Sequence, residues 1–240
     1  MQYIRGGNIL RLNAVALKHA FALSFISVVF LALCLAVFEP VISRAATDEF
    51  IVTQEITDEV SFTVPANDVA LSPSIPGITG GTANGSTAVA IATNSASGYT
   101  LDISFSTTTA MQGNTTTGYI NNYTPSSPGV PDFTFAIGGS GTPGEFAFTA
   151  TTSEAAATSG LDGSFLDNGA ACNTGSNMTN DRCWLNPSTT DERIISRTSV
   201  TSASGATTTL QFRVSVPSSP NPLIPGDTYT ATATLTATVQ

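Results

Sequence analysis

Beyond residue 46 the sequence has no lysine and no histidine. General bases and activated nucleophiles that work near neutral pH most often use one of these two side chains. Their absence excludes Ser-His-Asp, Cys-His and Ser-Lys catalytic sites from this part of the chain. A pair of carboxylates, as glycosidases use, remains an open alternative because acidic residues are plentiful. We therefore expect a protein that is not an enzyme and that carries no cofactor.

Positive charge is equally scarce. Residues 47–240 carry four arginines against sixteen aspartates and glutamates, which makes a formal net charge of −12. Proteins that bind nucleic acids need a cationic surface to neutralise phosphates. We therefore exclude nucleic acid as a partner, and we interpret the acidity as a source of solubility.

Helical patterns are missing too, because no stretch after residue 46 has a convincing 3.6-residue periodicity. Apolar and polar residues alternate instead, in a chain rich in threonine, serine, glycine, valine and alanine, and this pattern is typical of strands. Residues 87–106 predict a hairpin whose turn is Asn94–Gly98. The other strands are expected over Phe50–Val64, Asp132–Ile137, Glu145–Thr151, Arg193–Val200, Thr208–Val216 and Thr228–Val239.

Each predicted strand is apolar on one face only, so it must bury that face against a second sheet. The predicted fold is therefore all-β, an antiparallel β-sandwich of immunoglobulin-like or jelly-roll-like type over residues 47–240. Residues 152–187, which contain two cysteines, are interpreted as an elaborated insertion and not as a second domain. Joints rich in glycine or proline predict crossovers between the sheets, and they lie at Pro73–Gly85, Pro125–Pro131, Gly138–Gly144 and Pro217–Gly226.

The first 46 residues differ in kind from the rest. Basic residues precede an uncharged run over residues 20–38, and small residues follow it at Ser43–Ala46. This order predicts a secretory signal that is cut after Ala45. The run of 19 residues also approaches the roughly 20 that a membrane-spanning helix needs, so an N-terminal hydrophobic helix retained as a membrane anchor is the alternative. In both cases residues from about 47 onward are expected to be exported, to the cell surface or the extracellular space.

Cysteine is rare. Three cysteines occur, and Cys34 lies in the hydrophobic run, which leaves Cys172 and Cys183. An even pair in an exported chain predicts a disulfide. A closed zinc site is the alternative, but it needs two more ligands and no histidine is there to supply them. A disulfide that closes a loop of about 12 residues stabilises by roughly 3 kcal/mol in the chain-entropy model.

The single tryptophan, Trp184, directly follows Cys183. Two interpretations stay open: the ring packs over the disulfide as a small core, or it stacks on sugar rings. In the second case the tyrosines Tyr119 and Tyr123 complete a carbohydrate-binding surface.

Possible calcium ligands occur close together in sequence at Asp162, Asp167 and Asn168. Loop oxygens of this kind suit calcium on an acidic exported protein. Their spacing does not follow the EF-hand loop, and Asp-Gly and Asn-Gly are ordinary turn formers. We therefore interpret these residues as turns and predict no metal site.

The C-terminal strand begins after Gly226, 14 residues from the end, and its apolar residues alternate up to the terminus. This pattern resembles the closing segment of chaperone-usher fimbrial subunits and of secreted spore-coat-U-like proteins. Phe50–Val64 is similar to the alternating extension by which one such subunit completes the next. The resemblance implies self-association, or binding to other surface proteins, by strand addition at Phe50–Val64 and Thr228–Val239.

Together these patterns predict a non-enzymatic structural or adhesive protein of the bacterial cell surface, a class that includes fibre-like and pilus-like subunits. The alternative is a carbohydrate-binding module or adhesin that uses Trp184 and the two tyrosines. A membrane is expected as a partner only through residues 20–38, if the leader is retained.

Overall fold

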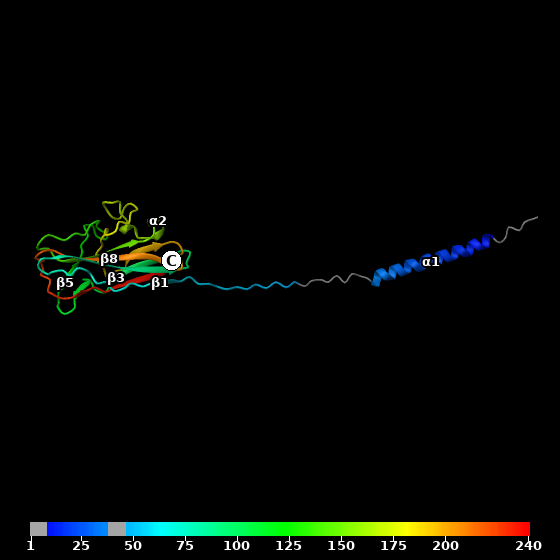
Figure 1. The fold of residues 1–240 in the computed structure, drawn as a ribbon, viewed down its shortest axis with the longest axis horizontal. Helices are drawn as coiled ribbons and strands as arrows, with labels where there is room; N and C mark the ends of the chain where they lie inside the picture. The colour runs from blue at the N-terminus through cyan, green and yellow to red at the C-terminus, as the bar shows by residue number, and fades with distance from the viewer. Residues whose placement is uncertain (1–8, 38–46) are drawn as a thin grey trace, which may run out of the picture. The chain divides into compact units, whose positions relative to one another are not determined.

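The computed structural model describes residues 9–37 and 47–240 of the chain, which divides into two compact units after Gln54. The first unit contains helix α1 (Ile9–Val37), which includes most of the predicted apolar run (Figure 1). Among the described residues, no helix is both long enough and hydrophobic enough to cross a membrane. The transmembrane helix expected as an alternative over residues 20–38 is not found among residues 20–37, the part of that range that the structure describes. The predicted cleavage site after Ala45 lies outside the described residues.

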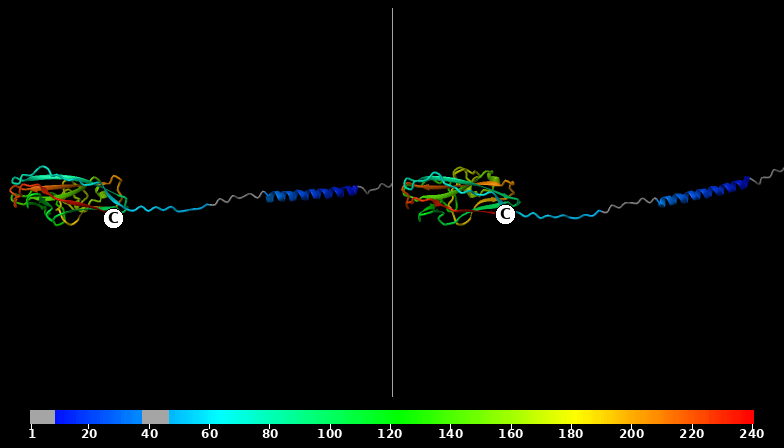
Figure 2. Two further views of the ribbon diagram at one scale, coloured as in Figure 1. Left: turned by 90° about the horizontal axis from the view of Figure 1, so that it is seen from below. Right: turned by 60° about the horizontal axis from the view of Figure 1, so that its bottom comes forward.

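Residues 55–240 form the second unit, which we call the β-body. Its described residues contain ten strands in two sheets (Figures 1 and 2). The seven-stranded sheet has the order β1-β2-β8-β6-β5-β4-β9, and the three-stranded sheet has the order β10-β3-β7. The elements are β1 (Val60–Val64), β2 (Gly81–Thr93), β3 (Tyr99–Phe105), β4 (Met111–Gly113), β5 (Tyr119–Asn122), β6 (Glu145–Thr152), α2 (Ala156–Ser159), the 3-10 helix η1 (Gly163–Phe165), β7 (Glu192–Arg197), β8 (Ala206–Val216), β9 (Tyr229–Thr230) and β10 (Ala233–Val239).

The longest ladder joins β2 to β8 and extends from the pair Gly81–Val216 to the pair Ile91–Ala206. All strand pairs of the β-body are antiparallel except β5 and β6, which run parallel. This pair corrects the prediction of a wholly antiparallel fold. A parallel pair needs a crossover of a dozen or more residues, and residues 123–144 between β5 and β6 supply it.

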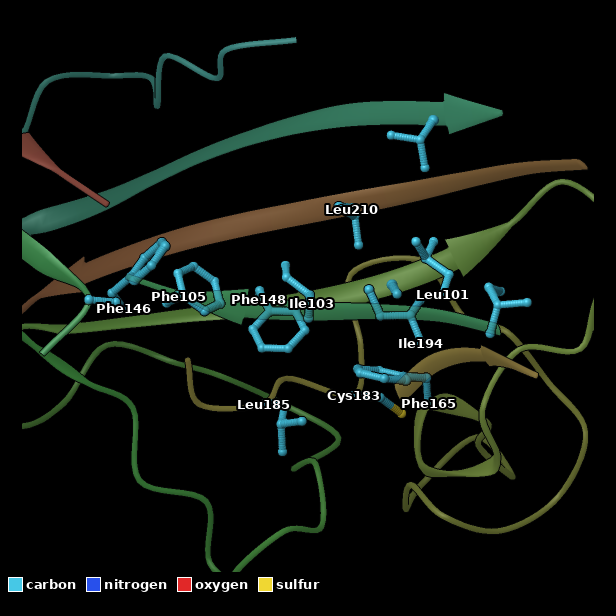
Figure 3. Close-up of a cluster of buried hydrophobic side chains, with 14 of the residues drawn as sticks. Leu101, Ile103, Phe105, Phe146, Phe148, Phe165, Cys183, Leu185, Ile194 and Leu210 are labelled. Carbon is cyan, nitrogen blue, oxygen red and sulfur yellow. The ribbon is translucent and has the colours of Figure 1, made fainter. Parts of the chain in front are cut away.

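Both sheets bury side chains in one hydrophobic core (Figure 3). Strand β3 contributes Leu101, Ile103 and Phe105 from alternate positions, because successive side chains of a strand point to opposite faces. The seven-stranded sheet contributes Val89, Ile91, Phe146, Phe148, Leu210 and Val214. The apolar faces of the two sheets therefore meet in a single interior, as the alternation in the sequence predicts.

The predicted turn at Asn94–Gly98 is present, but it connects the two sheets and does not close a hairpin. Gly98 donates its N–H to the Ser95 carbonyl at 3.1 Å and has a φ of 85°. Strand β2 pairs with β1 and β8, whereas β3 pairs with β10 and β7. The hairpin prediction is wrong because a buried face shows the same alternation whether the next strand pairs beside it or packs across the core.

Two predicted long strands are shortened or divided. Of Phe50–Val64, only Val60–Val64 forms a strand, and residues 47–59 belong to no sheet. Thr228–Val239 divides into β9, which pairs with β4, and β10, which pairs with β3 in the other sheet. The C-terminal strand therefore reaches both sheets.

Three other predicted strands are confirmed as β6, β7 and β8, with small changes of their bounds. Asp132–Ile137 is not a strand, since a single bridge between Asp132 and Trp184 is its only pairing among the described residues. Strand β2 begins inside the predicted joint Pro73–Gly85, and β4 and β5 arise where no strand was expected.

Residues 152–187 form no separate core. Leu161 and Phe165 of this segment enter the core that the two sheets share, and Figure 3 shows Phe165 there. Cys172 and Cys183 form a disulfide, which confirms the predicted pairing. Both sulfur-bearing residues are buried in the same core, so the insertion is fastened to the β-body.

Candidate functional site

A groove of about 820 Å³ with both apolar and polar lining residues lies beside the core of the β-body and includes Ala83 of β2. Its floor consists of buried core side chains, namely Ile103, Phe105, Phe146, Leu210 and Val214. Two segments border it: residues 66–75, which follow β1, and residues 224–235, which lead into β10. The groove therefore borders the interior that both sheets share.

Strands β1 and β10 provide open edges beside each other. Each is the last strand of its sheet, so one side of its backbone pairs with no other strand of the described chain, and the two strands are in contact. The far edge of the three-stranded sheet differs, because residues 160–162 cover it. There the Ser196 N–H donates to the Gly160 carbonyl at 2.7 Å, and the Asp162 N–H donates to the Ile194 carbonyl at 2.8 Å. Open edges such as those of β1 and β10 accept a strand from another chain.

The segment before β1 exposes large apolar side chains. Phe50, Val52 and Ile56, all at even positions, are 82%, 82% and 81% exposed, and Ile51 is 90% exposed. Apolar surface that is exposed as a contiguous patch commonly marks an interaction site. We call residues 50–56 the apolar extension.

Residues 57–59, which follow the extension, are held at the end of the β-body opposite to the groove. The Asn94 Oδ1 accepts the N–H of Glu59 at 2.7 Å, and its Nδ2 donates to the carbonyl of Thr57 at 3.0 Å. Asn94 directly follows β2, whereas the groove ends at Thr87 of that strand. The strand rises by roughly 20 Å between Thr87 and Thr93. The C-terminus lies at one end of the β-body (Figure 2). The N–H of the last residue, Gln240, donates to the carbonyl of Gly98 at 3.1 Å, and Gly98 belongs to the turn that begins at Asn94.

A second hollow, of about 420 Å³, lies where β2 and β8 pair, on the face away from the core. Its lining is mainly polar and includes Asn84, Ser86, Asn180, Asp181, Gln211 and Arg213. Arg213 donates to Asn84 Oδ1 at 2.6 Å and binds Asp181, while its guanidinium lies over the Trp184 ring. These contacts make Arg213 part of the packing of this face.

Trp184 is 1% exposed and packs against Phe135, with ring centroids 5.9 Å apart, in a small cluster apart from the main core. Cys183 and Leu185, its neighbours in sequence, belong to the main core, and the backbone at Cys183 is left-handed, with a φ of 60°. The ring also lines the second hollow, and the two interpretations of Trp184, stacking on a sugar or packing over the disulfide, stay predictions.

The two tyrosines of the predicted carbohydrate site differ in environment. Tyr123 packs on Phe135, with ring centroids 4.5 Å apart, and its hydroxyl donates to Asp132. Burial, aided by that hydrogen bond, raises the pKa of Tyr123 above its usual value. Tyr119 is exposed on β5 and does not belong to the cluster of Trp184. The structure therefore brings Tyr123 and Trp184 together as packed residues and leaves Tyr119 outside.

The three calcium candidates use their side-chain oxygens in backbone turns. Asp162 Oδ1 accepts the N–H of Ser164 at 2.9 Å, and Asn168 Oδ1 accepts those of the residues two and three positions later. Asp167 is fully buried and accepts two backbone N–H groups and the Thr179 hydroxyl. Burial by itself raises the pKa of Asp167, but these hydrogen bonds outweigh burial and hold the pKa below its usual value. Within residues 9–37 and 47–240, no three acidic, histidine or cysteine side chains are grouped to hold a metal ion.

Sequence reasoning found the extension but missed the groove. The groove is lined by segments that lie far apart in the chain. A local sequence pattern therefore cannot predict it. One signal was present: Leu71, Ile75 and Ile224 are apolar residues in or beside predicted joints, where no strand accounts for them. All three line the groove.

No protein-family model matches this chain, and no curated protein is significantly similar to it. Its function is therefore argued from the groove, the open edges and the extension.

Proposed function

We propose that this protein is an exported, non-enzymatic structural subunit of the bacterial cell surface that assembles end to end with copies of itself. In this proposal the β-body is a β-sandwich of immunoglobulin-like or jelly-roll-like type. One observation carries the proposal: a single chain has both an exposed apolar extension and a groove that borders its hydrophobic core.

The extension has the chemistry that the groove accepts. Phe50, Val52 and Ile56 share one parity, so in an extended conformation they point to the same side, toward the groove floor. The open edge of β10 supplies backbone hydrogen bonds, and the groove takes the alternate side chains, as in β-strand addition. Burying such a side chain fully stabilises by about 1.5–3 kcal/mol, before the entropy lost on association is subtracted.

The groove is better suited to the extension of a second copy than to the extension of the same chain. Asn94 holds residues 57–59 at the end of the β-body away from the groove. To reach its own groove the chain has to reverse direction near Ile56, and residues 50–59 contain neither glycine nor proline to favour a turn. A contact between unlike ends is heterologous, and it builds an open chain of subunits unless it closes into a ring.

The first experiment uses protein purified from cells that express the full chain, examined by analytical ultracentrifugation and electron microscopy. The wild type should form chains that lengthen with protein concentration. They should also lengthen with added salt, because salt screens the repulsion between acidic subunits. Val52→Asp should leave the protein monomeric, since it places a charge against the apolar floor of the groove. Ile51→Asp is the matched control, because it changes the neighbouring exposed side chain of opposite parity and should leave assembly intact.

A second pair of variants tests the groove. Ile224→Asp alters its border and should abolish assembly, whereas Leu223→Asp changes the exposed neighbour, which lies outside the lining, and should not. A mixture of the Val52→Asp and Ile224→Asp chains should stop at heterodimers, because one retains its groove and the other its extension. A wild type that is monomeric at every concentration, or equal behaviour of the Ile51 and Val52 variants, would contradict the proposal.

A further inference from the structure

One carboxylate, that of Asp227, ties the groove border to a distant turn. Asp227 Oδ2 accepts the N–H of Thr115 at 2.9 Å and the N–H of Thr116 at 2.8 Å, and the carboxylate also accepts both threonine hydroxyls at 3.0 and 2.9 Å. The N–H of Thr228 adds a fifth hydrogen bond at 2.8 Å. Thr115 and Thr116 lie between β4 and β5, 112 and 111 positions before Asp227. These bonds, led by that of the Thr115 backbone, hold the pKa of Asp227 far below its usual value.

Two glycines let the turn approach this carboxylate closely. A Cβ added to Gly113 would lie 2.7 Å from Thr116 Oγ1 and 2.8 Å from Asp227 Oδ2. A Cβ added to Gly118 would lie 2.7 Å from the hydroxyl oxygen of Tyr229. A larger residue at either position requires the side chains of Thr116, Asp227 or Tyr229 to shift from their present places. The turn is therefore built to hold the segment around Asp227.

That segment forms one side of the groove. Ile224, Pro225 and Tyr229 line it, and the Tyr229 hydroxyl donates to the Pro225 carbonyl at 2.7 Å. Strand β9 is two residues long and pairs only with β4 among the described strands. Asn114 makes two more hydrogen bonds: its N–H donates to the Thr228 carbonyl, and its Oδ1 accepts the Thr230 hydroxyl. The carboxylate thus supplies a large share of the bonds that position this side of the groove.

We propose that Asp227 is a positioning residue for self-assembly, which latches residues 224–230 to the β4–β5 turn and keeps the groove open for the extension of a second copy. This inference rests on the proposed function, because it requires that the groove receives the extension. Ile224 and Tyr229 pack against the core, and without the latch these two side chains are released from the positions that shape this side of the groove.

The test separates groove binding from polymer formation. The probe is a fluorescent peptide of residues 48–58, and the receptor is the full chain carrying Val52→Asp, whose own extension is disabled. The peptide should bind this receptor, and addition of Asp227→Ala should raise Kd at least about tenfold, which corresponds to about 1.4 kcal/mol. Asp132→Ala is the matched control, because Asp132 accepts hydrogen bonds from Ser126 and Tyr123 but lies outside the groove lining. It should leave Kd unchanged.

The outcomes are distinguishable. A peptide that binds the receptor with the same Kd when Asp227 is replaced overturns the latch and leaves the proposed function standing. A peptide that does not bind the receptor overturns the proposed function and the latch with it. If circular dichroism shows that Asp227→Ala loses folded structure, Asp227→Asn, which keeps the size of the side chain, replaces it. An unchanged Kd in that variant likewise overturns the latch.

Discussion

The guanidinium of Arg213 lies over the indole of Trp184, 4.4 Å from the ring centroid, and binds the Asp181 carboxylate at the same time. The same side chain donates to Asn84 Oδ1 at 2.6 Å and to the Phe135 carbonyl at 3.0 Å. Arg213 therefore connects β8 to β2 and to the two long segments that carry Phe135 and Trp184.

Arg213→Ala should lower the free energy of unfolding by about 2–3 kcal/mol, because it removes hydrogen bonds and a ring contact from a mostly buried cation. Denaturant unfolding followed by Trp184 fluorescence measures the loss. Arg193→Ala is the control, since its pair with Asp102 is at the surface and should contribute about 1 kcal/mol or less. Equal losses in the two variants would show that Arg213 does not organise this face.

Removal of the disulfide by Cys172→Ser together with Cys183→Ser should lower the free energy of unfolding by roughly 3 kcal/mol. For a domain of this size that loss corresponds to a fall in Tm of roughly 6–12 °C, which calorimetry measures. Cys34→Ser should leave Tm unchanged, because Cys34 lies in α1 outside the β-body. Free-thiol titration of both Cys172 and Cys183 in the folded wild type would refute the expectation.

Stability at alkaline pH should depend on Tyr99. Burial raises the pKa of Tyr99 to about 12, whereas an unfolded tyrosine titrates near about 10. The unfolded chain therefore loses its proton first as pH rises. The contribution of Tyr99 is complete below about pH 10 and is lost between about pH 10 and 12, by at most about 1.4 kcal/mol per pH unit. Tyr99→Phe should flatten this fall in urea titrations, and an equally steep fall in both proteins would disprove the role of Tyr99.

The buried carboxylate of Asp167 should stabilise the β-body at neutral pH. Its folded pKa lies below the usual value, so its contribution is present above about pH 4 and is lost as pH falls through the folded pKa. Asp167→Asn should lower the free energy of unfolding by about 1–3 kcal/mol at pH 7, because Gly169 and Thr179 lose their charged acceptor. The two proteins should converge in thermal unfolding toward pH 2. A difference that stays constant from pH 7 to pH 2 would argue against this linkage.

Millimolar calcium should leave Tm unchanged, because the side-chain oxygens of Asp162, Asp167 and Asn168 are bonded to turn N–H groups. A ligand that binds only the folded state raises Tm in proportion to its occupancy. An increase with calcium that disappears in Asp167→Asn would show that these turns hold a cation after all.

Much of the local structure follows from residue pattern alone. Strands β6 and β8 are predicted because their alternation is complete within each segment, and the disulfide is predicted because Cys172 and Cys183 are the two cysteines outside the leader. The apolar parity of Phe50, Val52 and Ile56 is likewise visible without coordinates. These features depend on residues that are close in the sequence. The two-residue period of a strand therefore allows the strands and their apolar faces to be predicted from the sequence.

The partners of each segment depend on residues far away in the chain. Only the tertiary structure shows that β2 and β3 belong to different sheets, that Trp184 packs in a cluster with Phe135, and that residues 47–59 lie outside both sheets. The groove has the same origin, because it exists where segments from distant parts of the chain stop short of covering the core. The sequence by itself thus determined which faces must be buried, whereas the tertiary packing decided what buries them and which apolar surfaces stay open.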